Sequence, residues 1–208
     1  MGKPNLKQYL TAYGLGDVSK IDLPSEISGD LENLEAGKNR TVEYATASFG
    51  QGIALTPIAI TRALCTLGNG GMLIDPHLRS KTIYPAGITK PFVVSEGTRV
   101  LKTSTSEEIT RMLVEVVDKA LLNGAVKMPR HSIAAKTGTA QISINGEYST
   151  DQYLHSFFGY FPAYDPKFLI FLYVVNPRGE QYASHTLTAP FIDLTKFLLS
   201  YYEVPPDR

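Results

Sequence analysis

The stretch "SIAAKTGTAQISINGEY", residues 132–148, decides the fold. A strand is predicted over about residues 133–144, and the pair Asn145 and Gly146 follows it. An Asn-Gly pair is the strongest short-range signal for a tight turn between antiparallel strands. A second strand is predicted over residues 153–161, so we expect these two strands to lie side by side and to run in opposite directions.

A third strand is predicted over residues 167–176, and the short connection "AYDP" joins it to the second strand. A short connection again favours antiparallel neighbours. The third strand is apolar without alternation, so we expect both of its faces to be covered. Helical patterns come before this block and after it. The order predicts an α+β fold, with one antiparallel sheet and helices packed on its faces.

The segment "TPIAITRALCTLGNGG", residues 56–71, predicts a helix with clear start signals, with Thr56 placed to cap it and Pro57 at its first helical position. The clearest helical repeat starts within "STSEE", which offers a capping box in two registers, and the last helix is predicted from Pro190 to about Tyr202. The side chains expected to face inward are Ile109, Met112, Leu113, Val116, Val117, Ala120 and Leu121 in the former and Phe191, Leu194, Leu198 and Tyr201 in the latter.

The first hundred residues hold weaker patterns. A short helix is predicted over about residues 6–13, and the turn-rich residues 17–47 are predicted to form a surface loop. Residues 72–98 are predicted to form short extended pieces that are separated by prolines.

Composition excludes several classes of protein. The chain has 208 residues, 43% of them hydrophobic, which is ordinary for a folded globular protein. Its 20 basic and 20 acidic residues give zero net charge, so there is no electrostatic case for binding nucleic acid or an anionic membrane surface. Its single cysteine, Cys65, excludes an internal disulfide and is expected to be a buried core thiol. No apolar run approaches the roughly 18 residues that cross a bilayer.

The run "AAKTGTAQ" carries the chemistry of the predicted first strand. Gly138 within a strand often marks the close approach of a ligand or another backbone. Thr137 and Thr139 place two hydroxyl groups on one face, and strict alternation places Lys136 on the other. At a sheet edge, unpaired N–H groups can bind a peptide as an added strand or point at a developing oxyanion. The strand must twist, or the lysine must curl around, for these groups to serve one site.

Several segments, in this order and spacing, resemble the C-terminal part of the transpeptidase domain of class B penicillin-binding proteins, over about residues 5–200. They are "YGLGDVSKIDLPSE", "ATASFGQGIALTPIAITRALCTLGNGGMLIDPHL", "IAAKTGTAQ", "HSFFGYFPAYDPKFLIFLYVVNP" and "TAPFIDLTKFLL". Serine β-lactamases share the Lys-Thr-Gly element. The "SFGQG" segment and the long middle segment favour the penicillin-binding family.

The resemblance implies a five-stranded antiparallel sheet with helices on both faces and the Lys-Thr-Gly-Thr strand at an edge. It implies acyl transfer in peptidoglycan cross-linking, in which a serine attacks the penultimate D-alanine carbonyl of a stem peptide; β-lactams acylate the same serine. Lys136 would act in the proton and electrostatic network. The Thr137 and Thr139 hydroxyls, beside Gly138, would hold the terminal carboxylate, and the Thr139 N–H would be an oxyanion donor. The resemblance implies no metal or other cofactor, and a membrane-anchored parent that works on the extracytoplasmic face.

The chain departs from the family pattern at the nucleophile. No serine, threonine or cysteine has a lysine three residues after it, so the family's Ser-x-x-Lys motif is absent. A Ser-x-Asn occurs at Ser143 and Asn145, but it follows the Lys-Thr-Gly strand and belongs to the predicted turn. We expect residues 1–208 to be the C-terminal portion of one domain that lacks the N-terminal strands and the nucleophile helix, with 1–130 mainly helix and loop and 131–208 three strands and a helix.

Three expectations follow from this departure. The chain alone should not form an acyl-enzyme. Without the family's first two strands, the strand over residues 167–176 should keep an unpaired edge, which favours self-association or pairing with the missing N-terminal segment. The membrane contact of the parent should run only through an N-terminal anchor outside this chain.

Two other functions stay open. One is a non-catalytic penicillin-binding-like domain that binds peptides or partner proteins. The other is an unrelated serine hydrolase with a Ser-His pair, although no Gly-x-Ser-x-Gly motif is present. The histidines His77, His131, His155 and His185 lack metal-ligand spacing, and His155 is expected to be a structural histidine with satisfied hydrogen bonds.

Overall fold

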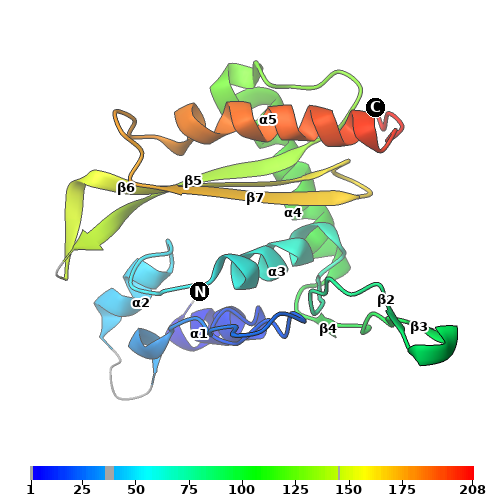
Figure 1. Ribbon diagram of the computed structural model, residues 1–208. Helices are drawn as coiled ribbons and strands as arrows, with labels where there is room; N and C mark the ends of the chain where they lie inside the picture. The colour runs from blue at the N-terminus through cyan, green and yellow to red at the C-terminus, as the bar shows by residue number, and fades with distance from the viewer. Residues whose placement is uncertain (1, 36–39, 145) are drawn as a thin grey trace. The chain divides into compact units, whose positions relative to one another are not determined.

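The computed structural model describes residues 2–35, 40–144 and 146–208. The chain forms two compact units (Figure 1). The first contains the chain up to Thr66 together with Gly71–Lys102, and the second contains Leu67–Gly70 and Thr103–Arg208.

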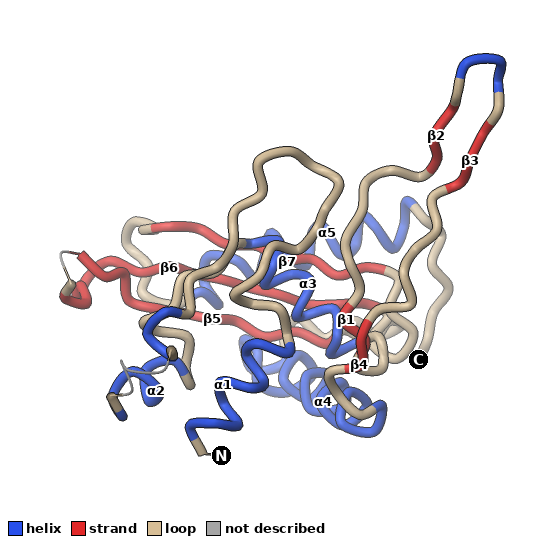
Figure 2. Tube along the Cα trace, turned by 90° about the horizontal axis from the view of Figure 1, so that it is seen from below, coloured by secondary structure: helices blue, strands red, loops and turns tan. Residues whose placement is uncertain are grey.

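The first unit is built from short elements around a small core. These are α1 (Lys3–Ala12), the 3-10 turn Glu32–Leu34, α2 (Thr41–Ala47), α3 (Pro57–Gly68, whose end lies in the second unit), β1 (Met72–Leu73), β2 (Lys81–Ile83), the turn Pro85–Gly87, β3 (Thr89–Pro91) and β4 (Thr98–Arg99). β1 pairs with β4, and β2 and β3 form a separate two-stranded ribbon (Figure 2). Leu34, Tyr44 and Ala47 form the buried cluster.

Helix start signals near residue 57 are confirmed, because the Ala59 N–H donates to the Thr56 hydroxyl at 3.2 Å. The loop predicted over residues 17–47 is wrong at α2, which forms because the Tyr44 hydroxyl, deep in the cluster, donates to the Leu34 carbonyl at 2.9 Å. Cys65 is half-buried rather than fully buried, and burial raises the pKa of its thiol.

The second unit holds the sheet predicted from the sequence. Its elements are α4 (Thr103–Glu115), a π-helical turn (Val116–Ala120), a 3-10 turn (Leu121–Gly124), β5 (Ala134–Ile144), β6 (Glu147–Phe161), β7 (Phe168–Val175) and α5 (Ala183–Tyr201). The strands are antiparallel in the order β5-β6-β7. The second strand begins earlier than predicted, because its pairing with β5 reaches back to Glu147. Asn145 of the predicted turn lies outside the described residues.

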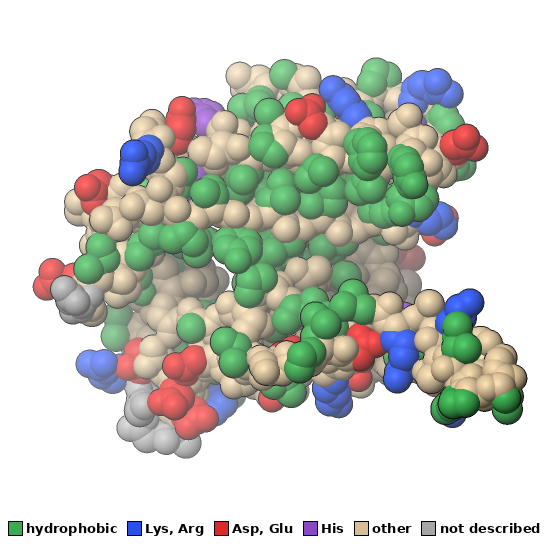
Figure 3. Space-filling model, in the orientation of Figure 1, with side chains coloured by type: hydrophobic (Ala, Val, Ile, Leu, Met, Phe, Trp, Pro, Cys, Tyr) green, Lys and Arg blue, Asp and Glu red, His purple; other side chains and the backbone are tan. Residues whose placement is uncertain are grey.

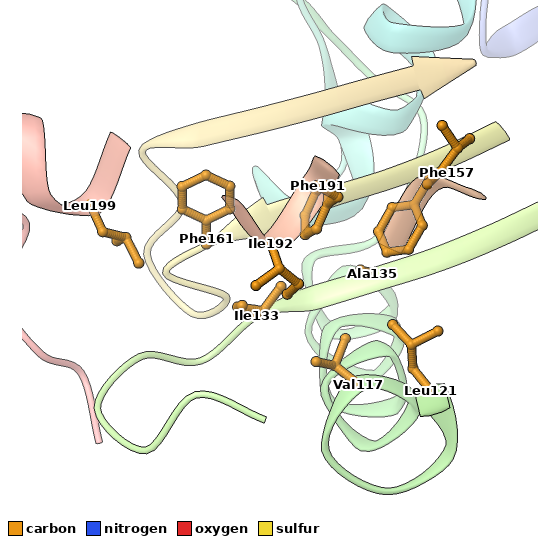
Figure 4. Close-up of a cluster of buried hydrophobic side chains, with 10 residues drawn as sticks. Val117, Leu121, Ile133, Ala135, Phe157, Phe161, Phe191, Ile192 and Leu199 are labelled. Carbon is orange, nitrogen blue, oxygen red and sulfur yellow. The ribbon is translucent and has the colours of Figure 1, made fainter. Parts of the chain in front are cut away.

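Both faces of this sheet are covered by helices, as the sequence predicts. Ala134 and Ala135 point to opposite faces of β5. Ala134 packs with Val114 of α4 and Tyr160, whereas Ala135 packs with the core under α5. That core, part of which Figure 4 shows, is formed by Val117, Leu121, Ile133, Ala135, Phe157, Phe161, Leu187, Phe191, Ile192 and Leu199.

Gly159 on β6 lets α5 lie close to the sheet. It pairs with Ala135 on β5, and a Cβ at this position would stand 2.4 Å from Cζ of Phe191 and 2.8 Å from Cβ of Ala135. The Phe191 ring uses this space and stacks on Phe157 with ring centroids 4.5 Å apart. A side chain at position 159 would therefore push the helix off the strands.

The buried face of α4 differs from the predicted stripe. Met112 is 55% exposed, and the buried face contains Ser106 and Thr110 instead. Hydroxyl groups are tolerated there because each has a partner: Ser106 donates to the Leu67 carbonyl at 2.6 Å, and Thr110 bonds the Tyr160 hydroxyl at 2.8 Å. The predicted capping box is also wrong, because the helix begins at Thr103 and "STSEE" lies inside it.

The last helix begins at Ala183, seven residues before the predicted start, and Pro190 lies inside it. A proline there removes one helical hydrogen bond. Burial of Ala183 and Leu187 stabilises the turns before it. Of the side chains expected inward, Phe191 is fully buried and Leu198 packs against the core, whereas Leu194 is 41% and Tyr201 68% exposed.

β7 is less covered than predicted. Tyr173 is 51% exposed and Val175 57% exposed. Within the part of the chain that the structure describes, β7 pairs with β6 alone, so its second edge has no strand partner. Hydrophobic side chains line the strip of surface where β7 lies below α5 (Figure 3).

The end of the chain is tied to the segment that leads into β5. Asp207 accepts hydrogen bonds from the Ser132 backbone at 2.7 Å and from its hydroxyl, and the Asp207 N–H donates to the Arg130 carbonyl at 3.1 Å. Arg208 bonds both carboxylate oxygens of Asp118 and the Met128 carbonyl. The start of β5 is thus fixed by residues about 75 positions later in the chain.

Candidate active site

β5 lies at the edge of the sheet, where the Lys-Thr-Gly-Thr run was predicted. Its one strand neighbour among the described residues is β6, so every second N–H and C=O along β5 has no strand partner. The Lys136 ammonium curls back and donates to the Thr137 carbonyl at 2.9 Å. Backbone direction alternates along a strand, so the N–H of Thr139 points the same way as the Thr137 carbonyl. The exposed ammonium of Lys136 and this N–H are therefore close to one edge.

The two threonines lie on the face that α5 covers. Thr137 pairs with Phe157, which is in the core under α5, and Thr139 pairs with His155. Lys136 is on the opposite face of β5 but reaches the strand edge with its ammonium, which is one of the two geometries that the sequence allowed.

The Thr139 hydroxyl has a partner that sequence reasoning missed. The Ala183 N–H, the first of α5, donates to Thr139 Oγ1 at 3.1 Å. A threonine hydroxyl has one proton to donate. The helix N–H occupies one of the two acceptor lone pairs of this hydroxyl and so restricts its orientation, which leaves the proton available to donate. Thr139 is exposed. The helix start was predicted at Pro190, so no sequence signal placed an N–H beside Thr139.

Gly138 is explained by a neighbouring strand. A Cβ at this position would stand 2.5 Å from Ser156 Oγ, and the Ser156 hydroxyl lies 3.5 Å from the Gly138 carbonyl. The close approach inferred from the glycine is thus made by a side chain of β6. A direct role for Gly138 in substrate binding stays a prediction.

Other polar candidates serve the fold. Ser132 is 1% exposed, donates its hydroxyl proton to Asp207 and accepts the Ala163 N–H at 2.9 Å. Ser143 pairs with Tyr148 at the end of β5, as expected for a strand end, and Asn145 of the Ser-x-Asn lies outside the described residues. His155 is fully buried with both ring nitrogens bonded, which confirms the structural interpretation.

Two hollows lie away from β5. Hollows of about 520 Å³ and 470 Å³ belong to the first unit, and their lining residues, from Lys7 to Thr98, do not include β5. Within residues 2–35, 40–144 and 146–208, no group of three histidine, cysteine or acidic side chains is placed to hold a metal ion. Among the described residues, β5 is an edge strand of its sheet.

An antiparallel sheet covered by helices, with a Lys-Thr-Gly-Thr edge strand, defines the class of fold used by serine acyl-transfer enzymes of the penicillin-binding kind. A family model described as "Penicillin binding protein transpeptidase domain" matches residues 1–195. The chain belongs to this family.

Individual relatives agree with this assignment. The chain is 32% identical over 195 residues to "Stage V sporulation protein D" of Bacillus subtilis, covering 92% of this chain and 30% of the relative. It is 27% identical over 189 residues to "Probable peptidoglycan D,D-transpeptidase PenA" of Neisseria meningitidis, covering 91% of this chain and 30% of the relative. The chain thus spans about 30% of the length of these curated relatives.

Solved structures confirm the predicted fold class. Penicillin binding protein 3 from Mycobacterium tuberculosis, complexed with aztreonam, matches with a TM-score of 0.82 and 25% identity over 97% of this chain and 47% of the other. The apo "TP domain" of penicillin-binding protein 3 from Burkholderia pseudomallei matches with a TM-score of 0.80 and 25% identity over 100% of this chain and 60% of the other.

Proposed function

We propose that this chain supplies the carboxylate-binding and oxyanion-binding wall of a peptidoglycan D,D-transpeptidase domain. The observation that carries the proposal is the donor set on the edge of β5: the Lys136 ammonium, and the Thr139 hydroxyl that is oriented by the Ala183 N–H. Hydrogen-bond donors such as these suit a ligand that carries a terminal carboxylate. A stem peptide that ends in D-alanine is such a ligand.

The proposed reaction is acyl transfer through a serine. The serine oxygen forms a bond to the penultimate D-alanine carbonyl carbon, the peptide C–N bond breaks, and the serine proton leaves with the departing D-alanine amine. An amine of a second stem peptide then takes the acyl group and restores the serine. A Ser-x-x-Lys segment must supply this serine, because the present sequence contains no such motif.

This chain's residues would act on both ends of the scissile bond. The Thr139 N–H would donate to the developing oxyanion, an interaction that typically contributes 10²–10³ in rate. The Thr137 and Thr139 hydroxyls would donate to the terminal carboxylate. Lys136 would stabilise negative charge and support proton transfer beside the serine. β-Lactams, whose ring amide and carboxylate resemble this peptide end, would acylate the same serine.

The place of the reaction is also a proposal. Cell-wall cross-linking requires the extracytoplasmic face of the bacterial membrane. No helix within the described residues combines the length and apolar character needed to cross a membrane. We propose that residues 1–208 form the C-terminal part of one domain, with the sheet-forming residues 131–208 carrying the site, and that the second edge of β7 receives another strand, from the same domain or a second copy.

A labelling experiment tests the proposal. The present chain, incubated with a fluorescent penicillin, should show no covalent label, and a longer chain expressed in frame with its upstream segment should be labelled. In the longer chain, Lys136→Ala should lower the acylation rate by about 10²–10³. Lys167→Ala is the matched control, because Lys167 is an exposed lysine paired with Asp165 in the β6–β7 turn. Equal labelling of the Lys136 variant and wild type would overturn the assignment.

One alternative keeps specific support. Lys136 and Thr139 present donors at β5 while the Ser-x-x-Lys motif is absent, which is what a non-catalytic peptide-binding domain would show. Binding of D-Ala-D-Ala peptides by the longer chain without any acylation would favour this alternative. The serine hydrolase alternative loses its best base, because the ring nitrogens of His155 bond Thr186 and Gln181 instead of a serine.

A further inference from the structure

The start of α5 is tied to the middle of the sheet by a buried histidine. We propose that His155 is a positioning residue for Thr139: it fixes the first turn of α5, whose leading N–H holds the Thr139 hydroxyl as a donor. The catalytic consequence of this inference rests on the proposed function. The positioning itself does not, and it can be measured in the present chain.

His155 makes two hydrogen bonds to one short segment. It is fully buried on β6, directly opposite Thr139 in the strand register. Its Nε2 lies 2.9 Å from the Gln181 carbonyl, and its Nδ1 lies 2.9 Å from the Thr186 hydroxyl. A carbonyl can only accept, so Nε2 must carry a hydrogen. In the neutral ring, Nδ1 can only accept, so the one proton of the Thr186 hydroxyl points to Nδ1 at 2.9 Å rather than to the Ala183 carbonyl at 3.3 Å.

These two anchors enclose the residue that contacts Thr139. Gln181 comes just before α5, and Thr186 lies in its first turn. Ala183 lies between them in the sequence, is fully buried, and donates its N–H to Thr139 Oγ1 at 3.1 Å. The contacts therefore form a closed loop: strand β6, the histidine ring, the helix start, and back to strand β5 opposite the histidine.

If this position only needed to be filled by packing, a histidine would be an unfavourable residue there, because its ring nitrogens are polar and buried. Burying an unpaired polar group is unfavourable, and an apolar residue would serve as filler without that cost. A planar ring with a donor nitrogen and an acceptor nitrogen instead holds the Gln181 carbonyl and the Thr186 hydroxyl at a set distance from each other. Loss of either bond would let the helix start move, and the Thr139 hydroxyl would lose the N–H that orients it.

The chemical consequence concerns which groups Thr139 can bind. With one lone pair bound by the Ala183 N–H, the hydroxyl is oriented and its proton suits a ligand that accepts, such as a carboxylate. When that N–H moves away, the hydroxyl can rotate, and its proton is no longer held in one direction for a ligand. We therefore expect His155 to affect ligands with a free carboxylate more than ligands in which that group is masked.

The first test uses the present chain and nuclear magnetic resonance. His155→Leu removes both hydrogen bonds and fills most of the volume, and His155→Gln keeps a donor toward the Gln181 carbonyl. His185→Gln is the control, since His185 is an exposed histidine of the same helix turn paired with Glu180. The measurements are hydrogen exchange of the Ala183 amide and the χ1 couplings of Thr139.

For His155→Leu we expect Ala183 exchange to rise at least tenfold and the Thr139 χ1 couplings to become averaged, while Leu199 near the far end of α5 keeps its protection. His155→Gln should show a smaller change in the same direction, and it provides the measurement should the leucine variant fail to fold. Unchanged Ala183 and Thr139 signals in a folded variant, or a parallel loss of protection along all of α5, would overturn the positioning role.

The second test measures the functional consequence in the longer, in-frame chain. His155→Gln should lower the acylation efficiency of benzylpenicillin by about three- to tenfold, the loss expected for one weakened hydrogen bond. The efficiency with the methyl ester of the same penicillin should fall less, because its carboxylate is masked. Equal losses for acid and ester would indicate a purely structural residue. If the wild-type longer chain takes no label, the proposed function fails, and the resonance experiment alone decides the role of His155.

Discussion

The Gly159→Ala substitution measures how tightly α5 lies on the sheet. The added methyl group would meet Cζ of Phe191 at 2.4 Å and Cβ of Ala135 at 2.8 Å. Both neighbours are fully buried, and the Phe191 ring is held by stacking on Phe157 and by an edge contact with Phe161. Neither neighbour is a flexible surface side chain that could turn away, so the helix or the strands must move.

The size of the effect follows from these distances. Carbon atoms in contact are about 3.5–4.0 Å apart, so the Phe191 ring must retreat by about 1 Å. Overpacking of this kind typically lowers the unfolding free energy by about 1–3 kcal/mol. Because both neighbours are rigid, we expect a loss in the upper part of this range, about 2–3 kcal/mol. In a strand, alanine is more stabilising than glycine by roughly 0.5–1 kcal/mol, because glycine loses more conformational entropy on folding. The net loss of unfolding free energy should be about 1–2.5 kcal/mol.

Urea unfolding followed by circular dichroism measures this loss in the present chain. Gly138→Ala is the matched control on the neighbouring strand: its methyl group meets only the Ser156 hydroxyl oxygen, at 2.5 Å, and that side chain can rotate away. We expect the control to change the unfolding free energy by less than about 0.5 kcal/mol. In a Phe191→Leu background, Gly159→Ala should lose most of its cost. A Gly159→Ala protein as stable as wild type, or an equal cost in both backgrounds, would refute the close-packing argument.

Two further changes test the tail and a buried hydroxyl. Burial would raise the pKa of the Asp118 carboxyl, but the hydrogen bonds and charge of Arg208, together with Lys127, hold it below its usual value. A lowered pKa stabilises the fold above the unfolded value of about 3.9 and loses that contribution as the pH falls through the folded value. Arg208→Ala should therefore cost about 1–2 kcal/mol at pH 7 and less at pH 3, by urea unfolding; a pH-independent loss would contradict this. Thr188→Val should raise stability by about 0.5–1.5 kcal/mol in the same assay, because Thr188 Oγ1 is buried without a hydrogen-bond partner among the described residues; a destabilised valine variant would show that the hydroxyl has a partner.

Local patterns in the sequence were sufficient for the sheet. The strands at β5, β6 and β7 follow from extended segments, short connections and a turn signal, all of which act over a few residues. The edge position of the Lys-Thr-Gly-Thr run came from the family resemblance rather than from periodicity. The curled Lys136 side chain was one of two geometries that alternation allowed.

Tertiary contacts decided what the sequence could not predict. The α5 start at Ala183 depends on burial against the sheet, whereas a proline at position 190 gives a strong local start signal that points elsewhere. The face of α4 was misassigned because Ser106 and Thr110 are polar by type and become compatible with burial only through partners on other segments. The Thr139–Ala183 hydrogen bond joins residues 44 positions apart, beyond the reach of any local rule.

The tie between the last residues and the start of β5 also determines how the second unit would respond to mechanical force. Asp207 holds the Ser132 backbone and hydroxyl, and Arg208 holds Asp118 and the Met128 carbonyl. A pull on Arg208 therefore loads several hydrogen bonds in parallel at the entrance to β5 before it reaches the end of α5. These contacts of the tail would have to break before the force could separate α5 from the sheet. Resistance to stretching should therefore depend first on the hydrogen bonds of Asp207 and Arg208, near the start of β5.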